Sequence, residues 1–306
     1  MDPLTQASKE ETMQSNNPVF RRSEEFHRGG ANLYGNQTYA GNGSPYQGYG
    51  QPVTDPSQWS VGTPGPTGYA PAQTSPMTID SVVQKTAITL GLVLVAAAAT
   101  WFVTPDIRTT GVTGGLAAAL TLGSLTAFGL SMVNSFKRVV SPALVMAFAV
   151  AEGVALGAFS KLIDAAYGTS EGANNLVVQA VIGTFAAFGG TLAAYKFFNI
   201  QVGQRFRVFV IAAVFGMVGL SILELVLSLF HAQLGLFGFG GLGIVTALVG
   251  LVLGVFMLIL DFDFVEQGIA NQLPERESWR AAFALTVSLV WIYTNLLRLL
   301  AIFSDN

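Results

Sequence analysis

The stretch GGLGIVTALVGLVLGVFMLIL (residues 240–260), followed by DFDFVEQG (residues 261–268), joins a long apolar run to three carboxylates. A helix that crosses a bilayer needs about 20 consecutive apolar residues, and this run has that length. The whole chain has a matching composition, because 51% of its 306 residues are hydrophobic and only 11% are charged. Soluble domains carry about 25% charged residues. The stretch and its surroundings therefore predict a membrane protein.

Apolar segments of similar length recur through the chain after residue 80. Six more lie near residues 82–104, 112–133, 142–163, 176–196, 207–230 and 281–303. Pro105, Pro142 and Pro274 fall at segment edges, where proline costs a helix little. Ser141 before Pro142 matches a helix N-cap followed by proline at the first helical position. The predicted fold is all-α, a bundle of seven transmembrane helices formed by residues 81–306.

Residues 1–80 have a different composition. Stretches such as NLYGNQTYAGNGSPYQGYG (residues 32–50) are rich in Gly, Tyr, Asn and Gln and show no apolar periodicity. Such a segment buries too little apolar surface to offset its ordering entropy, so we expect a disordered tail. It is either a solvated extension or, through its tyrosines, a phosphorylation or partner-docking segment.

The distribution of Lys and Arg predicts the orientation in the membrane. One side receives Lys137, Arg138, Lys196, Arg205, Arg207, Arg276 and Arg280, and the other receives Arg108, Lys161 and Arg298. Because Lys and Arg are enriched in cytoplasmic loops, the N-terminal tail is expected to be cytoplasmic and the C-terminus to lie outside.

The three acids after the sixth segment cannot share one side of a helix. At about 100° per residue, Asp263 lies about 200° from Asp261, and Glu266 about 140°. We expect Asp263 and Glu266 at the membrane interface, with Arg276 or Arg280 as candidate partners.

Asp261 continues a line of glycines along the sixth segment. Gly243, Gly250 and Gly254 each lie within about 20° of its direction on an ideal helix. Small residues at this spacing are typical of the face on which a membrane helix packs closely against others. Asp261 is therefore predicted to point into the bundle, although a simple charge at a helix end remains the alternative.

Two further acids lie inside apolar segments, Glu152 in AFAVAEGVALG and Glu224 in LSILELVLSLF. A charge at the bilayer centre costs about 3 kcal/mol on insertion scales, so such residues usually line a pathway or pair internally. Small or polar neighbours on the same helical faces, such as Ala149 beside Glu152 and Ser221 beside Glu224, indicate that both acids point inward. The alternative for each is a protonated carboxyl in one interhelical hydrogen bond.

The last segment carries Ala281, Ser288 and Asn295 at a spacing of seven residues. This small and polar stripe is expected to face the bundle core. Asn295 either donates to a carboxylate of the sixth helix or only joins two helices.

Composition excludes several classes of function. Cysteine is absent, which excludes disulfides and thiolate metal sites, and the only histidines are His27 and His231. A net charge of −3 offers no basic face for nucleic acid. No nucleophile stands beside a base and the seventh segment has no lysine for retinal, so we expect neither an enzyme nor a resident cofactor.

Several stretches together resemble one family. SPALVMAFAVAEGVALG (residues 141–157), LILDFDFVEQG (residues 258–268) and the compact seventh segment are similar to the Bax inhibitor family of seven-helix membrane proteins. NNPVFRRSEEF (residues 16–26) with LPERESWRAAFALTVSLVWIY (residues 273–293) resembles a bacterial, actinobacterial-like branch. The resemblance implies the bacterial plasma membrane and a pH-sensitive calcium leak channel, in which two aspartates on the sixth and seventh helices share a proton.

The resemblance also implies site residues. Asp261 matches the sixth-helix aspartate best and Asp263 second best, and Glu152 matches an acid before glycine on the third helix. The second aspartate falls at Asn295 of IYTN, so the titrating partner is missing. The basic latch of the family is not evident on the second helix, unless Lys137 or Arg138 at its cytoplasmic end serves.

Two functions are consistent with these residues. In the first, Glu152, Glu224 and Asp261 with backbone carbonyls hold a transient cation such as Ca²⁺ in a pore, with Asn295, Lys137, Arg138, Asp263 and Glu266 as further gate residues. In the second, the protein is a non-conducting regulator that binds a membrane protease or a stress-signalling partner through its Gly/Ala-rich helix faces and its tail.

Overall fold

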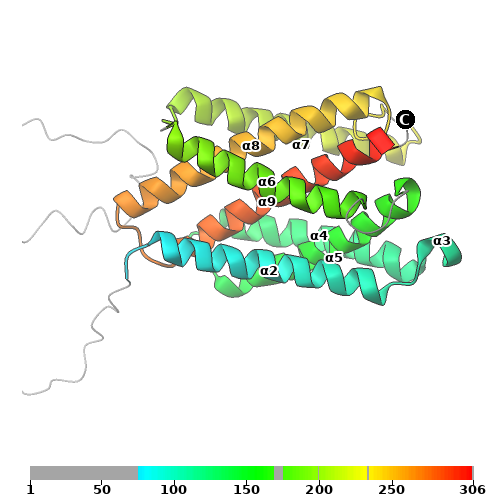
Figure 1. Ribbon diagram of the computed structural model, residues 1–306, viewed down its shortest axis with the longest axis horizontal. Coiled ribbons are helices and arrows are strands. Elements are labelled where there is room, and N and C mark those ends of the chain that lie inside the picture. The colour runs from blue at the N-terminus through cyan, green and yellow to red at the C-terminus, as the bar shows by residue number, and fades with distance from the viewer. Residues whose placement is uncertain (1–74, 169–174, 199, 233, 305–306) are drawn as a thin grey trace, which may run out of the picture. The chain divides into compact units, whose positions relative to one another are not determined.

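The computed structural model describes residues 75–168, 175–198, 200–232 and 234–304 (Figure 1). Its helices are α2 (Ile79–Val103), α3 (Ile107–Thr110), α4 (Gly114–Phe136), α5 (Pro142–Tyr167), α6 (Leu176–Phe197), α7 (Gln204–Leu229), α8 (Gly241–Ala270) and α9 (Glu277–Ser304). Within the described residues, seven helical segments are long and apolar enough to span a membrane, with α3 counted together with α2. The predicted all-α bundle of seven spans is confirmed.

The helix ends follow local sequence signals. Thr78 and Ser81 form a capping box at the start of α2, and Asn175 caps α6 by accepting from the backbone of Val177 and Val178. Pro142 opens α5 as predicted, but the side chain of Ser141 makes no capping hydrogen bond. The largest difference from prediction is in α8, which continues to Ala270 and so includes all three acids.

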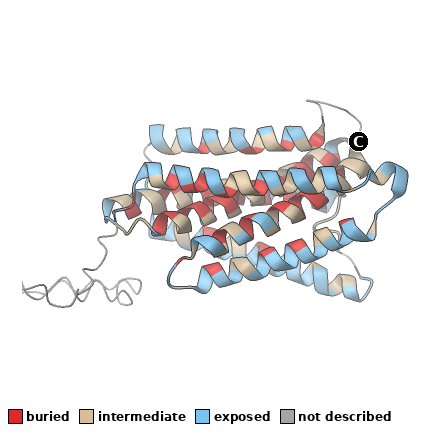
Figure 2. Cartoon of the chain, turned by 90° about the horizontal axis from the view of Figure 1, so that it is seen from below, coloured by how far each residue is buried: buried red, intermediate tan, exposed pale blue. Residues whose placement is uncertain are grey.

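Helix α9 lies at the centre of the bundle and packs against α2, α5, α6 and α8 (Figures 1 and 2). In the most apolar stretch of α9, 67% of the residues are buried inside the bundle, whereas in that of α7 only 11% are buried. α9 is nevertheless the least hydropathic of the spans. Its polar side chains, Thr286, Ser288 and Asn295 among them, are buried between helices and away from lipid.

Glycines allow the closest helix contacts. A Cβ at Gly157 of α5 would lie 2.5 Å from the carbonyl oxygen of Ala97 on α2, and Gly153 meets the same helix one turn earlier. On α4, a Cβ at Gly123 would lie 3.1 Å from the backbone nitrogen of Ala155. α5 is therefore held between α2 and α4 by backbone-to-backbone packing, as is common where small residues line membrane helices.

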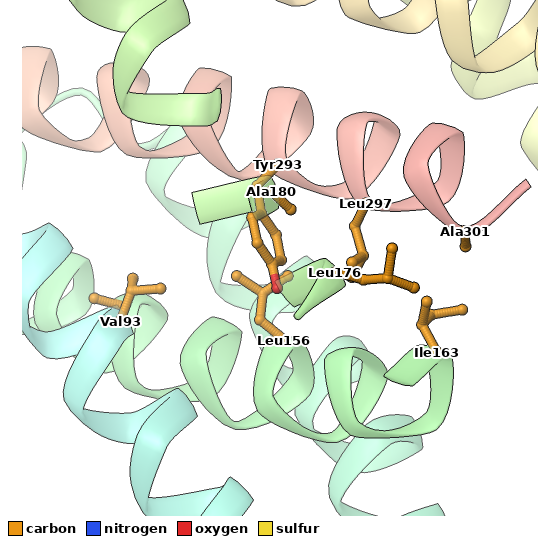
Figure 3. Close-up of a cluster of buried hydrophobic side chains, with 9 residues drawn as sticks. Val93, Leu156, Ile163, Leu176, Ala180, Tyr293, Leu297 and Ala301 are labelled. Atoms are coloured by element: carbon orange, nitrogen blue, oxygen red, sulfur yellow. The ribbon is translucent and has the colours of Figure 1, made fainter. Parts of the chain in front are cut away.

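Buried apolar side chains form two clusters around α9. In one of them, Tyr293 and Leu297 pack with Leu156 of α5 and Leu176 of α6 (Figure 3). The other contains Met77, which is 2% exposed and precedes α2. The backbone nitrogen of Met77 donates to the carbonyl of Leu273 at 2.7 Å, so residues 75–78 are fixed to the connection between α8 and α9. Residues 1–74 of the predicted tail lie outside the described residues.

Candidate functional site

The glycine face of α8 packs against α9, as its spacing predicts. The indole nitrogen of Trp291 donates to the carbonyl of Gly250 at 2.8 Å. A Cβ at Gly254 would lie 2.5 Å from Cγ1 of Ile292. Because glycine has no side chain, the two helix backbones approach each other closely here. Asp261 lies on the same face of α8, seven residues after Gly254.

Asp261 is half-buried and points at α9. Its Oδ2 accepts a hydrogen bond of 2.5 Å from the hydroxyl of Ser288. In the described part of the chain, no lysine or arginine forms an ion pair with Asp261. The carboxyl is therefore held inside the bundle by one neutral donor.

Asn295 lies farther along α9 and does not contact Asp261. Its Nδ2 donates to the carbonyl of Trp291 at 2.8 Å, and its side-chain atoms lie against Gly250. The α9 residue that faces Asp261 is Ser288, which belongs to the same predicted stripe one heptad earlier. The stripe is buried as expected, with Ala281 and Ser288 each 1% exposed.

Asp263 and Glu266 find partners on neighbouring helices. Arg207 of α7 forms an ion pair of 2.7 Å with Asp263, and Gln267 donates to the same oxygen at 2.8 Å. Asp263 is only 8% exposed, and its partner is Arg207 in place of the expected Arg276 or Arg280. Exposed Glu266 accepts from the hydroxyl of Tyr195 on α6 at 2.6 Å. These contacts hold α6 and α7 to the end of α8.

The side chains of Lys137 and Arg138 are exposed and do not reach Asp261. Their backbone carbonyls accept hydrogen bonds from Arg280, at 3.5 Å for Lys137 and 2.9 Å for Arg138. Arg280 also pairs with Glu277 at 2.8 Å. The loop after α4 is thereby joined to the start of α9.

Glu152 is half-buried on the face of α5 that meets α9. On this face, Phe148 makes an edge-to-face contact with Phe283 of α9, with ring centroids 5.0 Å apart. Two turns beyond Glu152, the hydroxyls of Ser160 and Tyr293 form a hydrogen bond of 2.6 Å. Glu152 itself has no hydrogen bond or ion pair with another described residue.

Glu224 belongs to a different region. It lies on peripheral α7, where its Oε1 accepts from the backbone nitrogen of Gly235 at 2.9 Å. Its Oε2 is buried without a described partner, and Ser221 on the same helix is exposed. The side chain therefore supports the connection between α7 and α8, which sequence periodicity alone did not indicate.

The described residues contain no group of three or more His, Cys, Asp or Glu side chains placed to hold a metal ion together. Asp261 is thus a single carboxylate, and any cation held there needs carbonyl oxygens or water for its other ligands, as calcium sites commonly use. Arg207 and Ser288 are the contacts that the sequence did not assign. Ser288 was within the predicted buried stripe, but Arg207 had no signal beyond its charge.

Within the described residues, six membrane-spanning helical segments surround or flank the central helix α9, which is the seventh span, and this arrangement defines a multi-pass membrane protein. The sequence profile of the family described as Bax inhibitor 1 like matches residues 17–305. The chain therefore belongs to this family, as the resemblance implied. A comparison with curated proteins gives no match.

Proposed function

We propose that this protein is a cation leak channel of the bacterial plasma membrane, permeable to calcium and regulated by protonation of Asp261. The supporting observation is the contact of Asp261 with Ser288 at the α8–α9 interface, where the carboxylate has no described cationic partner. Asp263, two residues away, is by contrast neutralised by Arg207. The two acids thus have different roles in this proposal, Asp261 in ion passage and Asp263 in helix anchoring.

A carboxylate inside a membrane domain is costly, and its retention usually reflects a role in a pathway or relay. A neutral hydroxyl donor holds the carboxylate in place while leaving its negative charge free to attract a cation. Conduction requires weak binding of this kind, because a tightly coordinated ion does not leave. Protonation of Asp261 would remove that charge and shift the balance between conducting and closed states.

Glu152 is the second acid of the proposed pathway. It faces central α9 from α5, as Asp261 does from α8, and it has no described partner. Calcium favours several oxygen ligands, including carboxylates and backbone carbonyls. Two carboxylates on opposite sides of one helix would serve as successive weak sites rather than as one shared cage.

The proposed orientation places the N-terminal tail in the cytoplasm. It is supported by the contact of Arg280 with the carbonyl of Arg138 and the ion pair of Arg207 with Asp263, which gather basic residues at one end of the bundle. The opposite end has Arg108, Lys161 and Arg298. The excess of positive charge favours the first end as cytoplasmic.

The test is calcium flux into proteoliposomes that contain the purified full-length protein, at mildly acidic and mildly alkaline pH. Asp261→Asn keeps the size of the side chain and removes its charge, and Asp80→Asn in the exposed first turn of α2 is the matched control. If Asp261 attracts ions, Asp261→Asn lowers flux, and if it holds the pathway closed, the same change raises flux. In both cases flux loses its pH dependence, whereas the Asp80→Asn variant retains it.

Absence of flux above empty liposomes, with folded and inserted protein, would overturn the channel and favour the regulator that binds a membrane partner. An observation that favours this second candidate is the exposure of α7, whose main contact is α8. A Cβ at Gly216 or Gly219 of α7 would meet nothing within 4 Å. Small residues on an uncovered helix face are suited to close packing with another membrane helix.

A further inference from the structure

A cavity of about 390 Å³ lies between α2 and α6, with α5 and α9 as its floor. Its volume falls within the range of about 300–1,000 Å³ typical of sites for small ligands. It is separate from the α8–α9 contact that contains Asp261, since neither Asp261 nor any other α8 residue lines it.

The cavity offers no free polar group from its hydroxyl side chains. The hydroxyls of Ser160 and Tyr293 bond to each other at 2.6 Å, and that of Thr184 donates to the carbonyl of Ala180 at 2.7 Å. The remaining lining consists almost entirely of apolar side chains. Apolar cavities do not favour water, because water needs two to four polar partners. The cavity is therefore suited to an apolar occupant.

The rim of the cavity opens toward the bilayer. Leu94 and Phe102 on α2 and Val178 and Phe185 on α6 line it and are between 39% and 83% exposed. These side chains belong to the lipid-facing surface of two membrane-spanning helices. An occupant can therefore enter sideways from the membrane, and the cavity is continuous with the established contact between protein and lipid.

The length of the cavity matches one leaflet. Its lining on α2 extends from Leu90 to Phe102, a rise of about 18 Å at about 1.5 Å per residue. The hydrocarbon core of a bilayer is about 30 Å thick, so one leaflet is about 15 Å. We propose that this cavity binds one acyl chain of a phospholipid from the leaflet at the Phe102 end of α2.

The bound acyl chain would lie against Leu289, Val290 and Tyr293 of α9. Leu289 follows Ser288 in α9, and Ser288 is the residue that donates a hydrogen bond to Asp261 of α8. The lipid would therefore contact α9 without touching the carboxylate of Asp261. Binding of the acyl chain does not require the protein to conduct ions. Its test can therefore succeed or fail independently of the channel proposal.

The test uses full-length protein in nanodiscs with phosphatidylglycerol that carries a photoreactive group on one acyl chain. Val181 lines the cavity, whereas Ile182, the next residue of α6, does not line it and is 60% exposed. Val181→Phe should lower labelling of the α2, α6 and α9 lining at least five-fold, and Ile182→Phe should leave it unchanged. Peptide mass spectrometry locates the labels.

Equal labelling of both variants, or labels spread evenly over exposed residues of all helices, would overturn the proposal. So would native mass spectrometry that finds a bound non-lipid molecule in the cavity of protein purified from its membrane. If the Val181→Phe variant does not fold, Ala98→Phe fills the cavity from α2 instead. It should lower labelling of the cavity lining by the same factor of at least five.

Discussion

The hydroxyl of Ser288 donates a 2.5 Å hydrogen bond to Asp261 across the contact between α9 and α8. Among the described residues, Ser288 is the polar partner of the Asp261 side chain. The bond joins the central helix α9 to α8, which packs against it. The same two helices are also joined by glycine packing, in which Gly254 meets Ile292, and by the hydrogen bond from Trp291 to the carbonyl of Gly250. A small polar pair at a tight apolar interface makes each partner sensitive to loss of the other.

Ser288→Ala should destabilise the protein by about 1–3 kcal/mol, because it leaves an inward-facing carboxyl without its donor. Thermal unfolding in detergent measures the loss. Ser221→Ala is the control, since Ser221 is exposed and donates only to the carbonyl of Met217 in its own helix. When Asp261→Asn is already present, Ser288→Ala should lower the stability of the protein by less. An equal loss of stability in both backgrounds would show that the two side chains are not coupled.

Arg207→Ala should loosen α7 from α8. Arg207 pairs with Asp263, which is 8% exposed and would be left with Gln267 alone. We expect a loss of about 1–3 kcal/mol, as for other buried charged groups that lose one partner. Arg205→Ala removes an exposed positive charge two residues earlier and should have little effect. Similar melting temperatures for both variants would contradict a structural role of the pair.

Gly157→Ala should force α2 and α5 apart. The new Cβ would lie 2.5 Å from the carbonyl oxygen of Ala97 and 2.9 Å from Cβ of Thr100. Overpacking of this kind costs about 1–3 kcal/mol. Gly189→Ala on α6 is the control, because nothing lies within 4 Å of its added Cβ and alanine favours a helix over glycine. A melting temperature of Gly157→Ala equal to the wild type would show that the contact can relax.

Glu275 makes the junction between the start of α2 and the α8–α9 connection dependent on pH. A hydrogen bond from Ser75, and then the hydrogen bond and charge of Lys85 at 2.9 Å, lower the pKa of the Glu275 carboxyl. The stabilisation is present above the ordinary pKa of glutamate, about 4.3, and is lost as pH falls through the lower folded value.

Thermal unfolding of wild type and Glu275→Gln between pH 7 and the acid limit of folding checks this expectation. At neutral pH the wild type should melt at the higher temperature, and the two curves should converge as pH falls below the ordinary glutamate range. Lys85→Met should reduce the same pH dependence, because it removes the ammonium group that pairs with Glu275. A difference between wild type and Glu275→Gln that stays constant with pH would refute the assignment.

Many features of this protein were set by local sequence. The apolar runs determined the seven spans, because a helix in lipid must satisfy its own backbone hydrogen bonds over a fixed thickness. The spacing of Gly250 and Gly254 determined which face of α8 packs closely, since helical periodicity is a property of one segment. The heptad of Ala281, Ser288 and Asn295 likewise indicated the buried face of α9.

Tertiary structure decided which helix faces meet and in which register along their axes. α9 is central although it is the least hydropathic span, because a position between the other helices keeps its polar side chains away from lipid. Ser288 rather than Asn295 faces Asp261, since the register between two helices depends on their packing and not on the sequence of either. Arg207 of α7 reaches Asp263 of α8, a pairing that depends on how the two helices pack and that neither segment specifies alone.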